Sequence, residues 1–269
     1  MSGKEIKHEC QSGIISGRMM SFFIGLVAGL FGGLVGLGGG VVMIPLMVGI
    51  RKLTQHKAHG TSLFALVFTG IAGAITYFFE GSVDIAASAL LAVTAVFTAR
   101  AGAKFAHALP EQKLKSSFGG FLIFVSLLLL IKPYLPGLLL STAHWHRAGI
   151  LLLAGVFAGF FSGMMGVGGG AIMVPVMVLF AGMSQHMSQG TSLLAMVPGG
   201  GVGAYTHLKL GNVEGALLAS LIPGILVGTY LGGTLAHKLP EAALRIIFAA
   251  VLIWIGSSYL GAKAPAERK

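Results

Sequence analysis

The sequence Gly36-Leu37-Gly38-Gly39-Gly40-Val41-Val42-Met43-Ile44-Pro45 decides the fold of this 269-residue chain. Glycine inside a helix costs about 1 kcal/mol relative to alanine, so three in a row predict a break. The same arrangement returns 130 residues later as Gly166-Val167-Gly168-Gly169-Gly170, followed by Pro175. The chain therefore interrupts an apolar segment twice, at equivalent places.

The composition is that of a membrane protein. Hydrophobic residues make up 55% of the chain and charged residues only 10%, whereas soluble domains carry roughly 25% charged residues. The net charge of +10 is scattered between apolar segments, which argues for orientation in a bilayer and against a nucleic-acid partner. The single cysteine, Cys10, excludes an internal disulfide. The apolar segments run over about 19–50, 60–79, 84–106, 114–131, 149–183, 190–208, 213–237 and 242–261.

The second half of the chain repeats the first half without a gap. Beyond the glycine stretches, the matches are Gly25, Gly29 and Gly33 with Gly155, Gly159 and Gly163; Gln55-His56 with Gln185-His186; Gly60-Thr61-Ser62-Leu63 with Gly190-Thr191-Ser192-Leu193; and Leu109-Pro110-Glu111 with Leu239-Pro240-Glu241. Internal duplication is therefore the strongest signal in the sequence.

The positive charges distinguish two topologies. If each broken stretch crosses the membrane once, nine lysines and arginines lie on each side and there is no bias. If each stretch turns back at its glycines, fourteen lie on the N-terminal side and four on the other. Setting aside Arg100 and Lys104 as intramembrane leaves twelve against four. This bias is typical of an inner-membrane protein whose N-terminal side is cytoplasmic, so we adopt the hairpin topology.

We therefore predict an all-α polytopic membrane protein of two inverted repeats, each a glycine-broken re-entrant hairpin followed by three transmembrane helices. Three crossings are an odd number, so the second repeat enters the membrane upside down, a common transporter design. The predicted parts are a cytoplasmic N-terminal tail at 1–18, repeat 1 at 19–132, a linker at 133–148, repeat 2 at 149–262 and a cytoplasmic C-terminal tail at 263–269.

The glycine turns are the candidate binding site. Non-helical backbone at membrane depth must be buried in protein or line a wet cavity, so we expect the two turns to face each other inside the molecule. Free N–H groups there, backed by two helix N-termini, would bind an anion without formal charge. The glycines concerned are Gly38, Gly39, Gly40, Gly168, Gly169 and Gly170.

Hydroxyl and ring side chains extend this candidate site. Thr61, Ser62, Thr191 and Ser192 are expected to start the next spans, where they cap a helix or donate to a ligand. Tyr77 and His207 occupy equivalent places late in a span, where a buried polar group is more often functional.

Structural interpretations of the same residues stay open. The triple glycines can be turns only, and the glycines at four-residue spacing are expected to be packing faces between helices. His56 and His186 are loop residues that belong to the surface or to gating. The sequence His144-Trp145-His146 is interpreted as an interfacial belt, and no metal site is predicted.

The paired GxGGG stretches followed by proline, each with a Gly-Thr-Ser about twenty residues on, resemble the TauE/SafE family of sulfite exporters and sulfonate permeases. The similarity runs from about Gly25 to Gly261. It implies transport of sulfite, sulfonates or related small organic anions across the plasma (inner) membrane of a bacterium or archaeon. The partners implied are a small sulfur-containing anion and the lipid bilayer, and a homodimer stays open.

The leading hypothesis is thus a secondary transporter, with export the favoured direction, that works by alternating access. No cofactor is expected, although H⁺ or Na⁺ could be the coupling ion. The alternatives are a passive anion channel and a carrier of an unrelated small solute. An intramembrane enzyme is disfavoured because the sequence has no GxSxG elbow, no HExxH and no aspartate pair within its spans.

Overall fold

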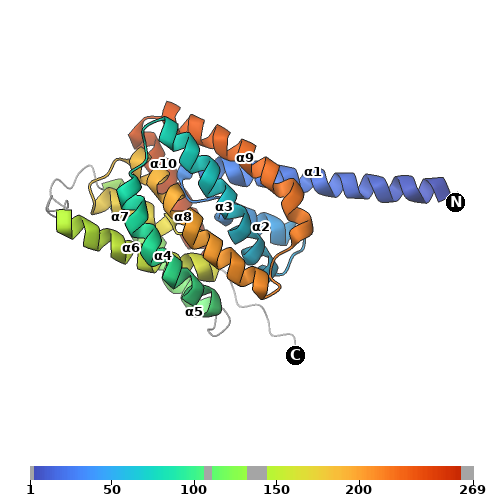
Figure 1. Ribbon diagram of the computed structural model, residues 1–269, viewed down its shortest axis with the longest axis horizontal. Coiled ribbons are helices and arrows are strands. Elements are labelled where there is room, and N and C mark those ends of the chain that lie inside the picture. Colours follow the sequence, from blue (N-terminus) through green and yellow to red (C-terminus); the bar gives the residue numbers. More distant parts are fainter. Residues whose placement is uncertain (1–2, 106–110, 132–143, 262–269) are drawn as a thin grey trace.

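The computed structural model describes residues 3–105, 111–131 and 144–261, with side chains omitted at 3–16, 111–118 and 144–145. These ranges are all-helical and contain no strand (Figure 1). The helices of the first half are α1 (Gly3–Val35), α2 (Gly40–Gly49), α3 (Gln55–Phe79), α4 (Ile85–Phe105) and α5 (Glu111–Ile131). Their counterparts are α6 (His144–Met165), α7 (Gly170–Leu179), α8 (Gln185–Lys209), α9 (Gly215–Lys238) and α10 (Glu241–Gly261).

The two halves interlock. Helix α1 packs mainly on α9, α6 packs on α4, α3 packs on its counterpart α8, and α5 packs on its counterpart α10. The first α1 turns extend beyond the bundle (Figure 1). Because each of these pairs joins one repeat to the other, both hydrophobic core clusters contain residues from both repeats.

Glycines let the helices of the two repeats approach closely. A Cβ atom on Gly29 would lie 2.5 Å from Ile225 O in α9, and one on Gly159 would meet Ala95 in α4. The flanking members of both glycine series likewise face backbone atoms of the partner helix. The predicted packing faces are therefore confirmed.

Each glycine-broken stretch turns back on itself. Arg51, just beyond α2, lies beside Gly17 of α1, and a Cβ atom there would be 3.2 Å from Arg51 Nη1. Met43 and Met47 of α2 share a core cluster with Ile24 of α1, so the two helices run side by side. The chain thus returns to the level at which α1 entered the bundle, as the hairpin topology requires.

Helices α3 and α8 run in opposite directions. The Cβ position of Gly203, late in α8, lies 3.4 Å from Leu63 near the start of α3, whereas that of Gly73, late in α3, meets Leu193 near the start of α8. Two repeats in the same orientation would place these helices parallel. The antiparallel crossing supports the inverted arrangement, whose orientation in a bilayer stays a prediction.

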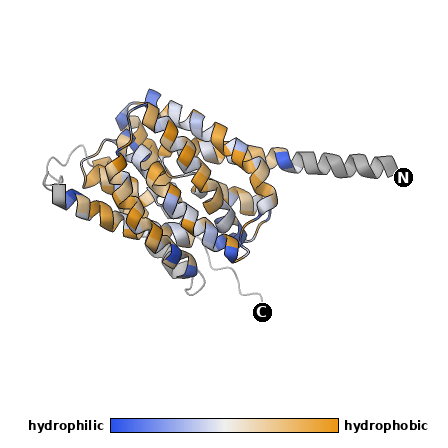
Figure 2. Cartoon of the chain, viewed as in Figure 1, coloured by the Kyte–Doolittle hydropathy of each residue, from blue (hydrophilic) through white to orange (hydrophobic). Residues whose placement is uncertain are grey.

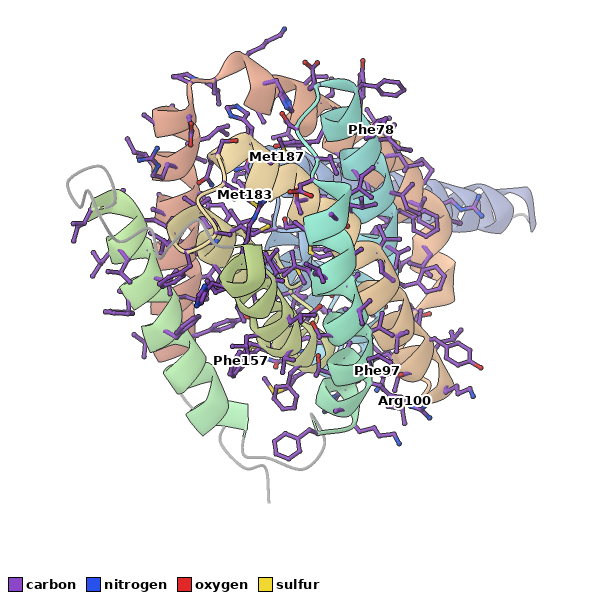
Figure 3. The ribbon with its side chains drawn as sticks, turned by 60° about the vertical axis from the view of Figure 1, so that its left-hand side comes forward. Phe78, Phe97, Arg100, Phe157, Met183 and Met187 are labelled. Carbon is purple, nitrogen blue, oxygen red and sulfur yellow. The ribbon has the colours of Figure 1, made fainter. Side chains whose placement is uncertain are left out.

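The surface is that of a multi-pass membrane protein. Within the described residues, six helices are long and apolar enough to cross a membrane. Hydrophobic residues cover the bundle (Figure 2), and large ones such as Phe79 and Phe97 are exposed on it. Arg100 and Phe78 lie near opposite ends of the bundle (Figure 3). Helix α8 is not among the six, although it matches α3 in length, because Pro198 and Gly201 stand where α3 has Phe68 and Ile71 and lower its hydropathy.

Some element limits differ from the expected ones. Helix α1 continues back to Gly3, through the segment predicted as a tail. Helices α3 and α8 begin five residues earlier than expected because Thr54 and Ser184 cap them, accepting from the N–H groups of Lys57 and Met187. Residues 133–143 of the predicted linker and the whole predicted C-terminal tail, 263–269, lie outside the described residues.

Candidate functional site

The two glycine turns meet in the interior of the protein. Gly38 and Gly168 adopt φ angles of 83° and 90°, in the left-handed region that favours glycine. A Cβ atom on Gly40 would lie 2.5 Å from Gly166 O, and one on Gly170 would overlap Gly36 O, so the backbones touch. Both turns are buried. The expectation that they face each other is met.

The two glycine turns carry backbone N–H groups that can act as hydrogen-bond donors. In the described chain, the structure shows no acceptor for the backbone N–H groups of Gly38–Gly40 or Gly168–Gly170. These groups stand at the N-terminal ends of α2 and α7, where the helix dipoles place partial positive charge. Buried N–H groups of this kind need an acceptor, and an anion is a suitable one.

Two serines clasp the turns across the repeats. Ser62 Oγ donates to Gly166 O at 2.8 Å, and Ser192 Oγ donates to Gly36 O at 2.8 Å. Each hydroxyl hydrogen is shared with a carbonyl of its own helix, that of His59 or Gln189. The serines therefore hold the turn of the opposite repeat in place, while their lone pairs remain acceptors. Binding of substrate by these serines stays a prediction.

The threonines cap helices of the opposite repeat. Thr61 Oγ1 accepts from Glu214 N at 3.0 Å, just before α9, and Thr191 Oγ1 accepts from Asp84 N at 2.9 Å, just before α4. The expectation that the Gly-Thr-Ser motifs start their own helices is wrong, because they lie in the second turn of α3 and α8. A Cβ on the preceding glycine, Gly60 or Gly190, would overlap the carbonyl of Asn212 or Ser82, so the motif needs glycine there.

We predict that Ser62→Ala and Ser192→Ala each weaken this clasp. Loss of one buried hydrogen bond lowers the free energy of unfolding by about 1 kcal/mol, and we expect transport to fall further because the turn is less rigid. The measurements are thermal unfolding in detergent and transport in proteoliposomes. Ser257→Ala is the control because Ser257 is exposed and donates only to Trp254 O in its own helix. Equal effects in all three variants would contradict the clasp.

Tyr77 and His207 are equivalent in space as well as in sequence. Tyr77 OH donates to Gly33 O at 2.9 Å, and His207 Nε2 lies 3.3 Å from Gly163 O, the matching carbonyl. Both side chains are buried in the last turn of their helices. The single hydroxyl hydrogen of Tyr77 is shared with Gln189 Oε1, which lies 3.0 Å from the hydroxyl oxygen. These side chains support the helix ends beside the turns, and their contact with substrate stays a prediction.

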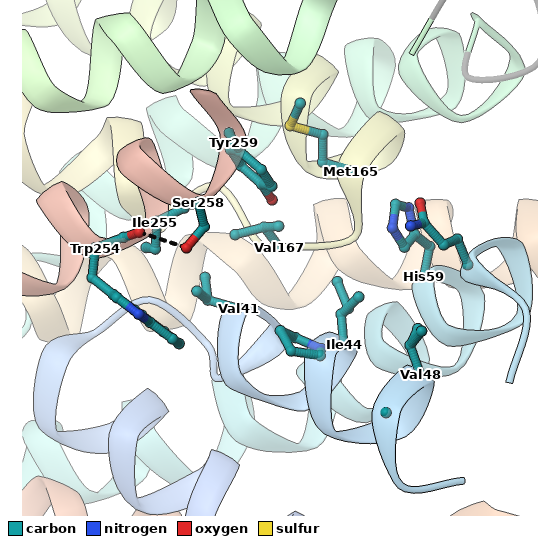
Figure 4. A pocket seen from close by; sticks show the side chains of 13 residues that line it. Val41, Ile44, Val48, His59, Met165, Val167, Trp254, Ile255, Ser258 and Tyr259 are labelled. Atoms are coloured by element: carbon teal, nitrogen blue, oxygen red, sulfur yellow. Dashed lines mark hydrogen bonds between the residues drawn. The ribbon is translucent and has the colours of Figure 1, made fainter. Parts of the chain in front are cut away.

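A cavity of about 460 Å³ leads to the turns from one side. It runs between α2, the first turns of α3 and the last turns of α10, and ends at Val41 and Val167 beside the two glycine runs (Figure 4). Pro45, Gly49 and Gln55 on its wall are exposed, so this side is open. Its polar side chains are Gln55, His59, Trp254, Ser258 and Tyr259. The cavity therefore extends from the end of the bundle where α2 stops to the two valines that flank the buried turns.

None of these cavity residues was among the predicted site residues. The sequence did contain a signal, because Gln55 and Gln185 are repeat equivalents, as are His59 and Gln189. All four positions lie outside the apolar segments predicted from the sequence. The α10 residues carry no motif. Across the side chains that the structure describes, no three metal-ligating residues cluster.

Buried, facing turns at the end of an open cavity, in a bundle of membrane-length helices, are the features of a membrane transport protein. The chain belongs to the sulfite exporter TauE/SafE family, whose match covers residues 21–259.

Several curated proteins are similar to this chain. YunE of Bacillus subtilis, a probable membrane transporter protein, is 28% identical over 88% of this chain and 96% of its own length. YdhB of the same organism, with the same description, is 26% identical over 84% and 94%. The probable membrane transporter protein MJ0441 of Methanocaldococcus jannaschii is 23% identical over 85% and 90%. No solved structure matches the chain. The chain is thus a membrane transporter of the TauE/SafE type.

Proposed function

We propose that the protein is a secondary transporter that exports sulfite, a sulfonate or a related small organic anion by alternating access. The observation that carries this proposal is the pair of touching glycine turns, whose N–H groups have no acceptor within the described residues, at the end of an open cavity. Sulfite and sulfonate groups present three oxygens to such donors. Neutral donors favour reversible binding, as transport needs.

The charge distribution supports a cavity that opens toward the cytoplasm. At the open end of the bundle the described side chains include Arg51, Lys52 and Lys57, whereas the opposite end carries Arg147, Lys238 and Arg245. Further cations at the open end, Arg100, Lys104 and Lys209, stand at the ends of α4 and α8. A cytoplasmic open end follows from the positive-inside rule, and both termini are then cytoplasmic. The cations there would also concentrate anions at the cavity mouth.

Transport assays in proteoliposomes test the proposal. We expect saturable uptake of radiolabelled sulfite or sulfoacetate and accelerated exchange when unlabelled substrate is present on the far side. Imposed H⁺ and Na⁺ gradients would identify a coupling ion. Flux without saturation or exchange would indicate a passive channel, and indifference to every oxyanion tested would refute the proposed substrate class.

A further inference from the structure

The two repeats are in different states although their sequences match. Pro45, Val48 and Gln55 of the first repeat line the open cavity. Their counterparts Pro175, Val178 and Gln185 are all buried. His59, which lines the cavity, corresponds to the buried Gln189. The position in the second repeat that is equivalent to the open cavity is therefore closed, and we call it the closed position.

Helix α5 closes the second position. It packs on α7, and Leu122 and Leu129 belong to the same core cluster as Val174 and Val178. Leu129 is fully buried, whereas its counterpart Tyr259 in α10 lines the open cavity. The pairs α2–α10 and α7–α5 thus differ in one respect: α10 leaves a cavity beside α2, and α5 fills the equivalent space beside α7.

Two glutamines at the closed position have unpaired polar atoms. Gln185 and Gln189 are both 0% exposed. Among the described residues, Gln185 Oε1, Gln185 Nε2 and Gln189 Nε2 have no hydrogen-bond partner. An unsatisfied buried polar group costs about 1–3 kcal/mol, and apolar side chains would fill this space more favourably. The glutamines are therefore suited to a different state of the protein, in which these amides meet water or solute.

We propose that Gln185 and Gln189 line the far-side half of the transport pathway and donate their side-chain N–H groups to the anion once α5 separates from α7. This inference rests on the proposed transport function, and it assigns residues to the half of the pathway that is closed in this structure. The positions repeat those of Gln55 and His59 in the open half. Carboxamides, like the backbone amides of the turns, are uncharged groups that donate hydrogen bonds to an anion. Neutral donors along the whole pathway would therefore keep binding of the anion weak and reversible.

Cysteine accessibility tests the opening. In a Cys10→Ser background, which removes the only cysteine, Val178→Cys is compared with its repeat equivalent Val48→Cys. A membrane-impermeant maleimide should label Val48→Cys from the open side and Val178→Cys only from the opposite side. When sulfite is added, the labelling rate of one variant should rise as that of the other falls. Transport by unmodified Val178→Cys protein that never labels would overturn the inference alone. Labelling of Val178→Cys without transport of any oxyanion would overturn the proposed function alone.

Leucine variants test the glutamines themselves. Gln185→Leu and Gln189→Leu should lower the transport rate at least tenfold while the midpoint of thermal unfolding stays level or rises, because unpaired polar atoms leave the core. If the glutamines had a purely structural role, the leucine variants would have a lower midpoint of thermal unfolding. Gln189→Leu also removes one of the two acceptors of Tyr77 OH. Gln185→Leu is the cleaner variant, because the side chain of Gln185 has no hydrogen-bond partner among the described residues. Unchanged transport in Gln185→Leu would refute its role in the path.

Discussion

Replacing Gly168 with alanine is expected to abolish transport while leaving folded protein in the membrane. Gly168 has a φ angle of 90°, where an L-residue loses about 1–2 kcal/mol. Its new Cβ would also lie 2.7 Å from Leu37 O in the opposite turn and 3.1 Å from Leu66 in α3. Because the backbone of the facing turn cannot yield as a flexible side chain does, the two turns must separate and their N–H groups must lose their common direction.

Gly211→Ala is the matched control for Gly168→Ala. Gly211 has a φ angle of 71° and nothing within 4 Å of its Cβ position, so the variant carries the same backbone strain without the clash. We expect it to keep most of the transport rate, measured as initial sulfite uptake per folded protein in proteoliposomes. Equal rates in the two variants would mean that the contact between the turns is unimportant for transport.

Replacing Gly29 with leucine is expected to have the largest effect on stability. Its Cβ would lie 2.5 Å from Ile225 O and 3.0 Å from Thr229 N, so α1 would have to move away from α9. Overpacking of a core costs about 1–3 kcal/mol when side chains can adjust, and here the obstacle is backbone. We therefore expect little monodisperse protein after extraction in detergent, or a markedly lower midpoint of thermal unfolding.

Gly201→Leu separates the packing effect from the loss of a helical glycine. Gly201 lies within α8 and has nothing within 4 Å of its Cβ position. Leucine has the higher helix propensity, by about 1 kcal/mol, so this variant should be as stable as the parent or slightly more so. If Gly29→Leu and Gly201→Leu unfold at the same temperature, close packing of α1 on α9 at Gly29 does not hold the repeats together.

The sequence by itself determined the membrane class, the family resemblance, the duplication and the return hairpins. Glycine runs and hydropathy act locally, and charge bias depends only on the order of segments, so these properties are readable without contacts. The equivalence of Tyr77 and His207 also followed from spacing. The starts of α3 and α8 were misplaced because the caps Thr54 and Ser184 precede the apolar run and escape a hydropathy criterion.

Only the tertiary structure showed what the hydroxyl motifs contact and where the cavity lies. Ser62 and Gly166 are 104 residues apart, and no local pattern of residue types specifies which carbonyl a serine will meet. Gln55 is exposed and Gln185 is buried. The sequence cannot predict this difference in burial, since the two repeats carry the same residue at this position. Burial is set by the helix that packs alongside, α10 or α5, so only the packed molecule distinguishes the open half from the closed one.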